Sequence, residues 1–258
     1  MHERANILIT GASTGLGAGM AREFAARGRN LALCARGIEQ LEQLRAELLR
    51  THRGINVVVA QLDVNNHDHV FTVFHQLSQK LDGLDRVIVN AGISQGWPIG
   101  TGHFGSNLAI ANTNFVAALA QCEAAMEIFR ARSDGHLVVI SSIAGLRGMP
   151  GYQTYSATKA GVATLAEAIR ADTLTTPINV TTIYPGYIES GLGPAGEKKP
   201  FRVSTKKGVQ AMVKAIEREP AQAKVPAWPW AAIGFTLRRL PLRLIAKTGE
   251  GANRTYIR

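Results

Sequence analysis

The feature that most constrains the fold is the regular alternation of short apolar runs with longer segments of helical pattern. The apolar runs are rich in Val, Ile and Leu without polar alternation, as in strands covered on both faces. The predicted strands are Asn6–Thr10, Leu31–Ala35, Asn56–Leu62, Arg86–Asn90, Leu137–Ser141, Asn179–Tyr184 and a short one near Lys224–Pro226. The predicted helices between them are Gly17–Arg27, Ile38–Arg53, His67–Leu81, Ser106–Arg132 and Tyr152–Thr175.

Strand–helix alternation at this spacing builds βαβ units with right-handed crossovers. We therefore predict an α/β fold, a doubly wound parallel sheet with helices on both faces. The chain has 258 residues and is 46% hydrophobic, enough for one well-packed domain. We assign residues 1–225 to this domain and residues 226–258 to a basic, aromatic-rich C-terminal extension. Ligands of such sheets bind beyond the carboxyl ends of the strands.

A glycine-rich loop directly follows the first predicted strand and precedes an amphipathic helix. It reads Thr10-Gly11-Ala12-Ser13-Thr14-Gly15-Leu16-Gly17. Gly11 permits a tight turn, and Gly15 and Gly17 let backbone approach a pyrophosphate and let the helix approach the sheet. The free N–H groups and positive dipole of the helix N-terminus favour phosphate there. The predicted dinucleotide contacts from this loop are Gly11, Ser13, Thr14, Gly15, Leu16 and Gly17.

The end of the second predicted strand, LALCARG, indicates which dinucleotide binds. A site that prefers NAD places a carboxylate there to bind the ribose 2′-hydroxyl. This chain has Ala35 at that point, followed by Arg36, whose guanidinium can bind a 2′-phosphate with paired charged hydrogen bonds. The Ser13 hydroxyl would add a further bond to the same phosphate. The alternative is an ordinary solvated arginine; the missing acid favours NADP(H).

Tyr155 and Lys159 form the central catalytic pair that we predict. They stand four residues apart, so on a helix they share a face. Tyr152 has no such lysine partner. A free phenol has a pKa of about 10, and a neighbouring ammonium favours phenolate. Tyr155 can then act as general acid in reduction and general base in oxidation.

With its TGxxxGxG loop and YxxxK pair, the sequence resembles the short-chain dehydrogenase/reductase family, whose domain is Rossmann-type. The motifs follow in the family's order from residue 7 to residue 190. Ser142 lies thirteen residues before Tyr155, the family's spacing for a hydroxyl that stabilises the developing alkoxide. Strand alternation should turn Ser141, the competing candidate, to the opposite face. Asn114 matches the fourth catalytic position, where its amide would hold a water that links Lys159 to solvent; Asn112 is the nearby alternative.

The resemblance also implies further cofactor contacts. Asp63 and Val64 would lie beside the adenine, and Asn90-Ala91-Gly92 would support the pocket wall. Lys159 would bind the nicotinamide ribose. The segment after the sixth strand would hold the carboxamide and diphosphate through Pro185, Gly186, Ile188 and Ser190. The family usually has Thr at this last position, and Ser keeps the hydroxyl.

The resulting prediction is an enzyme that transfers a hydride between NADP(H) and a small-molecule carbonyl or secondary alcohol. The family also implies a homodimer or homotetramer. Substrate choice should depend on residues 94–104, 145–153 and a lid over 189–204. Five side chains form either an apolar pocket or ordinary packing: Trp97, Met149, Tyr152, Tyr187 and Leu192. Two other functions stay open: a cofactor-binding sensor or scaffold without turnover, and a membrane-recruited interaction protein.

The net charge of +10 is unevenly distributed. Residues 1–196 carry 15 basic and 15 acidic residues, whereas residues 197–258 carry 14 and 4. This split argues against a general nucleic-acid surface. In residues 226–247, aromatic and apolar side chains interleave with Arg238, Arg239, Arg243 and Lys247. That pattern suits an anionic membrane surface and a hydrophobic, lipid-, steroid- or acyl-like substrate; the alternative is a pocket cap or subunit contact. Pro241 should divide the segment into two short helices.

Cysteine and histidine usage predicts neither a disulfide nor a metal site. Cys34 and Cys122 lie in apolar runs and are expected to be buried free thiols. His67, His69 and His75 fall at an exposed helix start without a matching ligand cluster. The first strand begins about six residues into the chain, which leaves no room for a signal peptide. We expect a cytoplasmic protein, with peripheral attachment to a membrane as the alternative.

Overall fold

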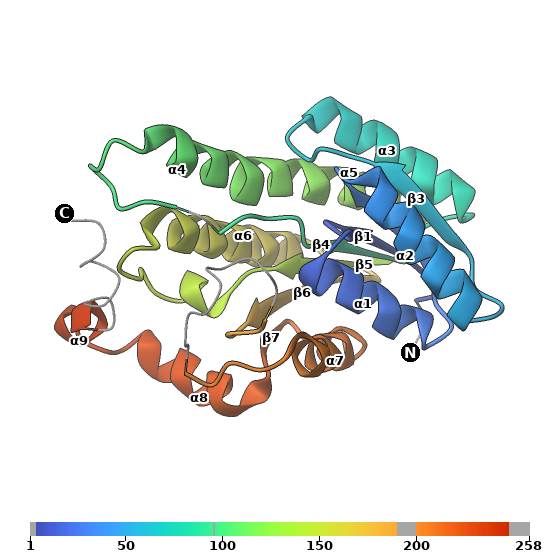
Figure 1. Cartoon of the computed structure of the whole chain (residues 1–258). Coiled ribbons are helices and arrows are strands. Elements are labelled where there is room, and N and C mark those ends of the chain that lie inside the picture. The colour runs from blue at the N-terminus through green and yellow to red at the C-terminus, as the bar shows by residue number, and fades with distance from the viewer. Residues whose placement is uncertain (1–3, 95, 190–199, 248–258) are drawn as a thin grey trace.

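A seven-stranded parallel sheet in the order β3-β2-β1-β4-β5-β6-β7 forms the centre of the molecule (Figure 1). The computed structural model describes residues 4–94, 96–189 and 200–247. The strands are β1 Asn6–Thr10, β2 Asn30–Ala35, β3 Val57–Gln61, β4 Arg86–Val89, β5 Gly135–Ile140, β6 Ile178–Pro185 and β7 Gln222–Val225. The order reverses between β1 and β4, as in a doubly wound fold. The predicted fold class is confirmed.

Helices cover both faces of this sheet. One face packs on α1 (Gly15–Ala25), α2 (Ile38–Thr51) and α7 (Thr205–Ile216). The other packs on α3 (His67–Lys80), α5 (Ala117–Arg132) and α6 (Gln153–Asp172). Two short helices, α8 (Ala227–Leu237) and α9 (Leu242–Lys247), follow β7 at the end of the sheet (Figure 1). Of the described helices, none is both long and apolar enough to cross a membrane.

The central strands are buried on both sides, as their unbroken apolar sequence predicts. In β1, Ile7 and Ile9 face one core while Leu8 faces the other, and all three are fully buried. Each such side chain contributes about 1.5–3 kcal/mol to folding. The same burial surrounds Cys34 and Cys122, which are free thiols whose pKa it raises to about 12.

Helix α7 was not among the helices predicted from the sequence. It begins after Ser204, whose hydroxyl accepts a hydrogen bond from the Lys207 N–H and so caps the helix. Its buried face consists of Gly208, Val209, Met212, Val213 and Ile216. Apolar residues at this spacing are a helical signal, and it lies within the basic run that was interpreted only by its charge.

The predicted helix Ser106–Arg132 is interrupted. The chain forms α4 (Phe104–Ala111), then a π-helical turn η1 (Asn112–Val116), and then α5. The turn carries Asn114, which is almost fully buried and bonded to the backbone of Ile93. Such turns occur where a side chain is held off the regular helix path. The predicted break at Pro241 is confirmed, because α8 ends at Leu237 and α9 begins at Leu242.

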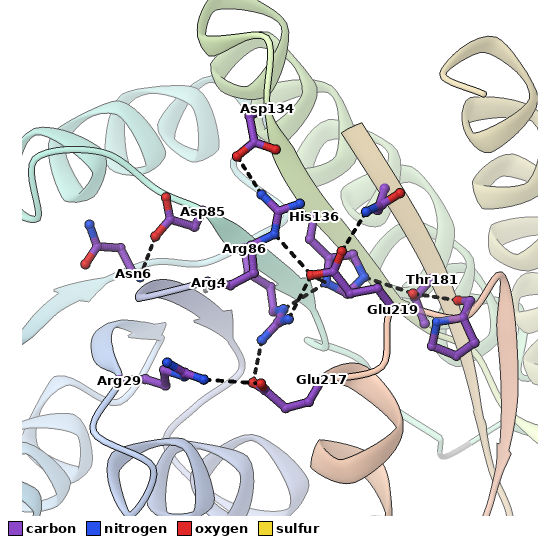
Figure 2. Close-up of polar contacts among 12 residues, drawn as sticks. Arg4, Asn6, Arg29, Asp85, Arg86, Asp134, His136, Thr181, Glu217 and Glu219 are labelled. Atoms are coloured by element: carbon purple, nitrogen blue, oxygen red, sulfur yellow. Dashed lines mark hydrogen bonds and ion pairs between the residues drawn. The ribbon is translucent and has the colours of Figure 1, made fainter. Parts of the chain in front are cut away.

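A charged network closes the amino-terminal edge of the sheet (Figure 2). At its centre is Arg86, the first residue of β4, which is 1% exposed. Its guanidinium lies 2.8 Å from a carboxylate oxygen of Glu217 and 3.1 Å from one of Glu219. Arg4 also bonds Glu219 and Asp134. A buried guanidinium needs such partners, because an unpaired buried charge is strongly destabilising.

The hydrogen bonds around His136 fix it as the neutral tautomer. Arg86 Nε donates to His136 Nδ1 over 2.8 Å. The Thr181 hydroxyl donates to the Pro220 carbonyl, so His136 Nε2 must carry the proton that bonds Thr181 over 2.9 Å. Burial, with the charges of Arg86 and Arg4, lowers the pKa of His136 well below its usual value of 6.5. The network is therefore a structural tie between β4, β5 and β6.

Candidate active site

The residues proposed for chemistry lie at the opposite edge, beyond the carboxyl ends of the strands. Because all strand pairs are parallel, β1, β4, β5 and β6 end at one edge. The glycine-rich loop follows β1, Asn90 follows β4, Ser142 follows β5, and the Pro-Gly segment ends β6. The switch between β1 and β4 lies beside the first two of these segments. This is where open α/β sheets bind nucleotides.

The glycine-rich loop is shaped by positions that admit no side chain. Gly11 and Gly15 have φ of +63° and +56°, where L-residues are strained. A Cβ on Gly17 would lie 2.2 Å from the Gly11 carbonyl oxygen. Gly17 thus lets the first turn of α1 pack directly on the loop, as the sequence spacing suggested.

A polar latch holds this loop against the end of β4. The Thr10 hydroxyl accepts from the backbone N–H of Asn90 at 2.9 Å and of Ala91 at 3.0 Å. The Asn90 amide in turn donates to the Thr10 carbonyl at 2.9 Å. Asn90 was predicted to support the pocket wall, whereas the part of Thr10 was missed. The sequence signal for this contact was the Thr10 hydroxyl at the end of β1 and the Asn90 amide after β4, because these strands are adjacent and parallel.

The start of α1 fits a phosphate group. Thr14 occupies the N-cap position, yet its side chain makes no capping hydrogen bond. The first N–H groups of a helix have no partner within the helix, and here no side chain of the described residues caps them. Together with the glycines that bring the loop close to the helix, this leaves an N-terminus open to an anion. Ser13 lies half-buried in the same loop.

The end of β2 carries no carboxylate. Ala35 is buried, and Arg36 next to it is exposed. Gln61 donates to the Arg36 carbonyl at 3.0 Å and so holds its backbone, while the guanidinium has no bond within the described residues. In the loop after the neighbouring strand β3, the Asp63 carboxylate accepts from the Asn65 backbone and side chain. Val64 is buried beside it.

Lys159 is a buried lysine with one clear polar contact. It lies on α6, is 6% exposed, and its Nζ donates to the Ile140 carbonyl at 2.9 Å. Desolvation lowers its pKa to about 8. The ammonium lies 5.9 Å from the centre of the Tyr155 ring, one helical turn away. The buried position of Lys159 therefore places its ammonium next to the Tyr155 phenol ring.

The two adjacent serines after β5 have different surroundings. The Ser141 hydroxyl is buried and donates to the Lys159 carbonyl at 2.7 Å, so its hydrogen is committed. Ser142 is half-buried, and its oxygen accepts from the Ala144 N–H at 3.1 Å. The Ser142 hydroxyl hydrogen thus remains available to a ligand. Gly145 keeps this loop on α6, since a Cβ there would lie 2.8 Å from the Lys159 carbonyl.

The two asparagines of the π turn lie on different sides. Asn114 accepts from Ile93 N at 2.8 Å and donates to Ile93 O at 2.7 Å. A Cβ on Gly92 would lie 3.1 Å from the Asn114 oxygen and 3.5 Å from Lys159 Nζ, which places these two groups around one point. Asn112 is exposed and lines a surface depression with Asn65 and His67.

The segment after β6 packs against the C-terminal extension. A Cβ on Gly186 would lie 2.2 Å from the Trp230 indole, and the Tyr187 ring meets the same indole edge-on at 5.1 Å. Ile188 pairs with Val203 in a parallel bridge, which joins the two ends of the predicted lid. Ser190 and Leu192 lie outside the described residues. The contact with Trp230 was not predicted.

The other candidate pocket residues lie around the same edge. Trp97 stacks on His103 with ring centres 3.8 Å apart. Tyr152 precedes α6, and its ring lies edge-on to Tyr155 at 6.5 Å. The backbone N–H of Met149 donates to the Ser156 hydroxyl. Among the described residues, no group of three His, Cys, Asp or Glu side chains gathers as metal ligands would.

Residues 5–200 match the family model described as short chain dehydrogenase. The chain belongs to the short-chain dehydrogenase family. This short-chain dehydrogenase is accordingly an oxidoreductase of alcohols or carbonyls, a class that uses a nicotinamide cofactor.

Individual relatives extend over most of the molecule. An uncharacterized oxidoreductase of Mycobacterium tuberculosis is 51% identical over 93% of this chain and 96% of its own length. An 11-beta-hydroxysteroid dehydrogenase 1A of Arabidopsis thaliana is 30% identical over 95% of this chain and 76% of its own. An alcohol dehydrogenase from Thermococcus sibiricus, solved with 5-hydroxy-NADP, has a TM-score of 0.77 and 22% identity, covering 86% of this chain and 96% of that one. The last likeness concerns the fold alone.

Proposed function

We propose that this short-chain dehydrogenase is an NADP(H)-dependent carbonyl reductase, reversible in principle. The observation that carries the proposal is the buried Lys159 ammonium beside the Tyr155 ring, next to a loop in which the Ser142 hydroxyl hydrogen is free. The bound nicotinamide cofactor would supply the hydride. The cytoplasm is the proposed location, and the usual reduced state of the NADP pool is the reason to propose reduction as the direction.

In the proposed reaction, Tyr155 donates its phenol proton to the substrate oxygen, and Ser142 donates a hydrogen bond to the same oxygen. The two donors stabilise negative charge as it develops there. In oxidation the same groups act in reverse. Lys159 favours the phenolate through its positive charge.

Lys159 is also suited to pass a proton onward. A pKa of about 8 lets its ammonium give up a proton near neutral pH. Asn114 uses one N–H and one lone pair on Ile93. A second N–H and a second lone pair remain on this amide, enough for the proposed relay water.

The proposed cofactor contacts divide between the glycine-rich loop, the strand ends and the segment after β6. The Arg36 guanidinium, with no bond within the described residues, would take the 2′-phosphate. Arg36→Asp should therefore lower the ratio of kcat/KM with NADPH to that with NADH at least tenfold. Arg53→Asp, at an exposed position on another loop, is the matched control. An unchanged ratio in Arg36→Asp would contradict the choice of NADP(H).

A hydrophobic substrate is favoured by the aromatic side chains near the lid ends. The Trp230 indole is met edge-on by Tyr187 and by Phe201, the latter at 6.4 Å. The name of the Arabidopsis relative, a hydroxysteroid dehydrogenase, suggests the same class. We propose lipid-, steroid- or acyl-like carbonyls as first candidates.

Turnover is tested by NADPH oxidation over a panel of ketones and aldehydes that includes these classes. Tyr155→Phe keeps the ring but removes the proton donor, and should abolish turnover while NADPH binding persists. The matched control is Tyr184→Phe, which makes the same change at a buried tyrosine outside the proposed catalytic and pocket residues. Binding of NADPH without turnover across the panel would instead favour a sensor or scaffold.

We also propose a homodimer or homotetramer built through α4 and α5. Large apolar side chains are exposed along these helices and the π turn between them: Phe104, Leu108, Phe115, Val116 and Leu119. A patch of this kind on a surface helix commonly marks a protein interface. Leu119→Glu should lower the mass measured by light scattering, whereas Leu174→Glu, at an exposed position in the turn after α6, should not.

A further inference from the structure

Helix α8 is apolar on both of its sides. Its inner side chains, Trp230, Ile233 and Leu237, pack with Ile143, Leu146, Ala163 and Tyr184. Its outer side chains include Ala231, Ala232 and Phe235, and the exposed Trp228 precedes them at a kink where the backbone is not helical. The outer face of a surface helix is normally polar. The apolar character of the outer face of α8 therefore needs an explanation other than packing within the protein.

The exposed apolar residues continue from α8 into α9. Trp228 is 81% exposed, Phe235 62%, Leu242 67% and Leu244 47%. Single exposed apolar side chains are ordinary on protein surfaces. Four large ones within seventeen residues, on two consecutive short helices, form a patch of the kind that binds a partner.

The turn between these helices and α9 carry only positive charge. Arg238, Arg239 and Arg243 are exposed, and no acidic residue occurs from position 220 to position 249. The Arg239 guanidinium lies 3.8 Å above the centre of the Phe235 ring. Arg239 and Phe235 therefore lie on the same side of the segment.

The segment is fixed to the body of the protein at three points. Trp230 is buried under the Gly186 backbone, Ile245 is 1% exposed, and Arg147 donates to the Leu240 carbonyl at 3.1 Å. The last bond holds the turn between the two helices. The outer side is thus presented by a preformed support and needs no folding on contact.

We propose that the outer side of α8 and α9 binds the surface of an anionic lipid bilayer. Aromatic and aliphatic side chains would enter the interface, while the three arginines meet lipid phosphates. Charge complementarity decides between occupants. A second copy of this chain would set like charges against each other, whereas an anionic bilayer opposes them with negative charge. This binding is independent of the reaction that the enzyme catalyses.

The test is flotation of the full-length protein with two kinds of vesicle. One consists of phosphatidylcholine alone, and the other of phosphatidylcholine and phosphatidylglycerol in equal parts. We expect binding to the anionic vesicles only, reduced by added salt. Each basic residue near an anionic bilayer raises the affinity for it by a factor of about five. Changing Arg238, Arg239 and Arg243 together to Gln should therefore weaken vesicle binding on the order of 100-fold. Trp228→Ser with Phe235→Ser should weaken it about tenfold or more.

Matched controls separate this surface from general charge and stickiness. Arg27, Arg50 and Arg53 changed together to Gln remove the same charge from exposed positions elsewhere, and Leu174→Ser removes an equally exposed leucine. Circular dichroism checks that each variant is folded. No binding of the unaltered protein, or equal loss in tail and control variants, would overturn the proposal. The proposal would also be overturned if the protein does not bind vesicles and the double variant Trp228→Ser with Phe235→Ser has a lower oligomer mass than the unaltered protein.

Discussion

Replacing Lys159 by Met should stabilise the cofactor-free protein at pH 7 while it abolishes turnover. The folded protein holds the pKa of this lysine at about 8, against 10.5 for the unfolded chain. That difference of about 2.5 units corresponds to roughly 3 kcal/mol for keeping the charge buried. Loss of the bond to the Ile140 carbonyl offsets about 1–2 kcal/mol. The net expected gain is about 1–2 kcal/mol in unfolding free energy.

The pH dependence gives the sharper measurement. Between about pH 8 and 10.5 the folded protein has released the Lys159 proton while the unfolded chain still holds it. The unaltered protein therefore gains stability with rising pH over this range, by up to about 1.4 kcal/mol per unit, and the Met variant does not. Its advantage should shrink or reverse by about pH 10.

The assay is equilibrium urea unfolding, followed by circular dichroism at fixed protein concentration and without cofactor, at pH 7 and at pH 9.5. Lys80→Met is the control, because this lysine is exposed on α3. A stability difference between the Lys159 variant and the unaltered protein that is the same at both pH values would refute the reasoning.

Three further perturbations address other parts of the structure. Because the pKa of His136 is lowered in the fold, the unaltered protein should lose up to about 1.4 kcal/mol of stability per unit as pH falls below 6.5; urea unfolding of His136→Asn should lack this slope. Gly17→Ala forces a Cβ toward the Gly11 carbonyl and should weaken NADPH binding at least tenfold, measured by fluorescence titration. Gly186→Ala collides with Trp230 and should lower the Tm by about 5 °C in calorimetry, with partial recovery on adding Trp230→Leu.

Each of these has a clear contrary outcome. If the unfolding free energy of His136→Asn still falls as steeply below pH 6.5, the pH dependence comes from other groups. Normal NADPH affinity in Gly17→Ala would mean that the loop gives way without affecting the cofactor site. If the double variant Gly186→Ala with Trp230→Leu has a lower Tm than Gly186→Ala alone, the collision with the indole is not the cause of the lower stability.

Local patterns explain what could be predicted from the sequence. Strands buried on both faces appear as unbroken apolar runs, and a glycine-rich turn between strand and helix is recognisable because its residues are contiguous. The Tyr155–Lys159 pair was found in the same way, from four-residue spacing. The parallel, doubly wound sheet followed from the strand–helix alternation, whereas its strand order was not predicted.

Contacts between distant residues account for what could not be predicted. Arg86 reaches His136 and Glu217, 50 and 131 positions away, and nothing near Arg86 in the sequence marks it as buried. The Thr10 latch depends on Asn90, 80 residues later. Likewise, the seat of Trp230 at Gly186 depends on how the extension returns to the sheet. Such pairings become visible only when the strands are placed side by side.

The π turn between α4 and α5 has a consequence for comparing this chain with its relatives. A wider turn contains one residue more than the α-helical path requires, and one residue corresponds to about 100° of rotation. Residues before and after η1 therefore face directions that a continuous helix would not give them, and in this phase Phe129 and Ala125 reach the sheet core. A relative that lacks the extra residue should be aligned with a gap at 112–116, and a helix transplanted between the two must carry that residue with it.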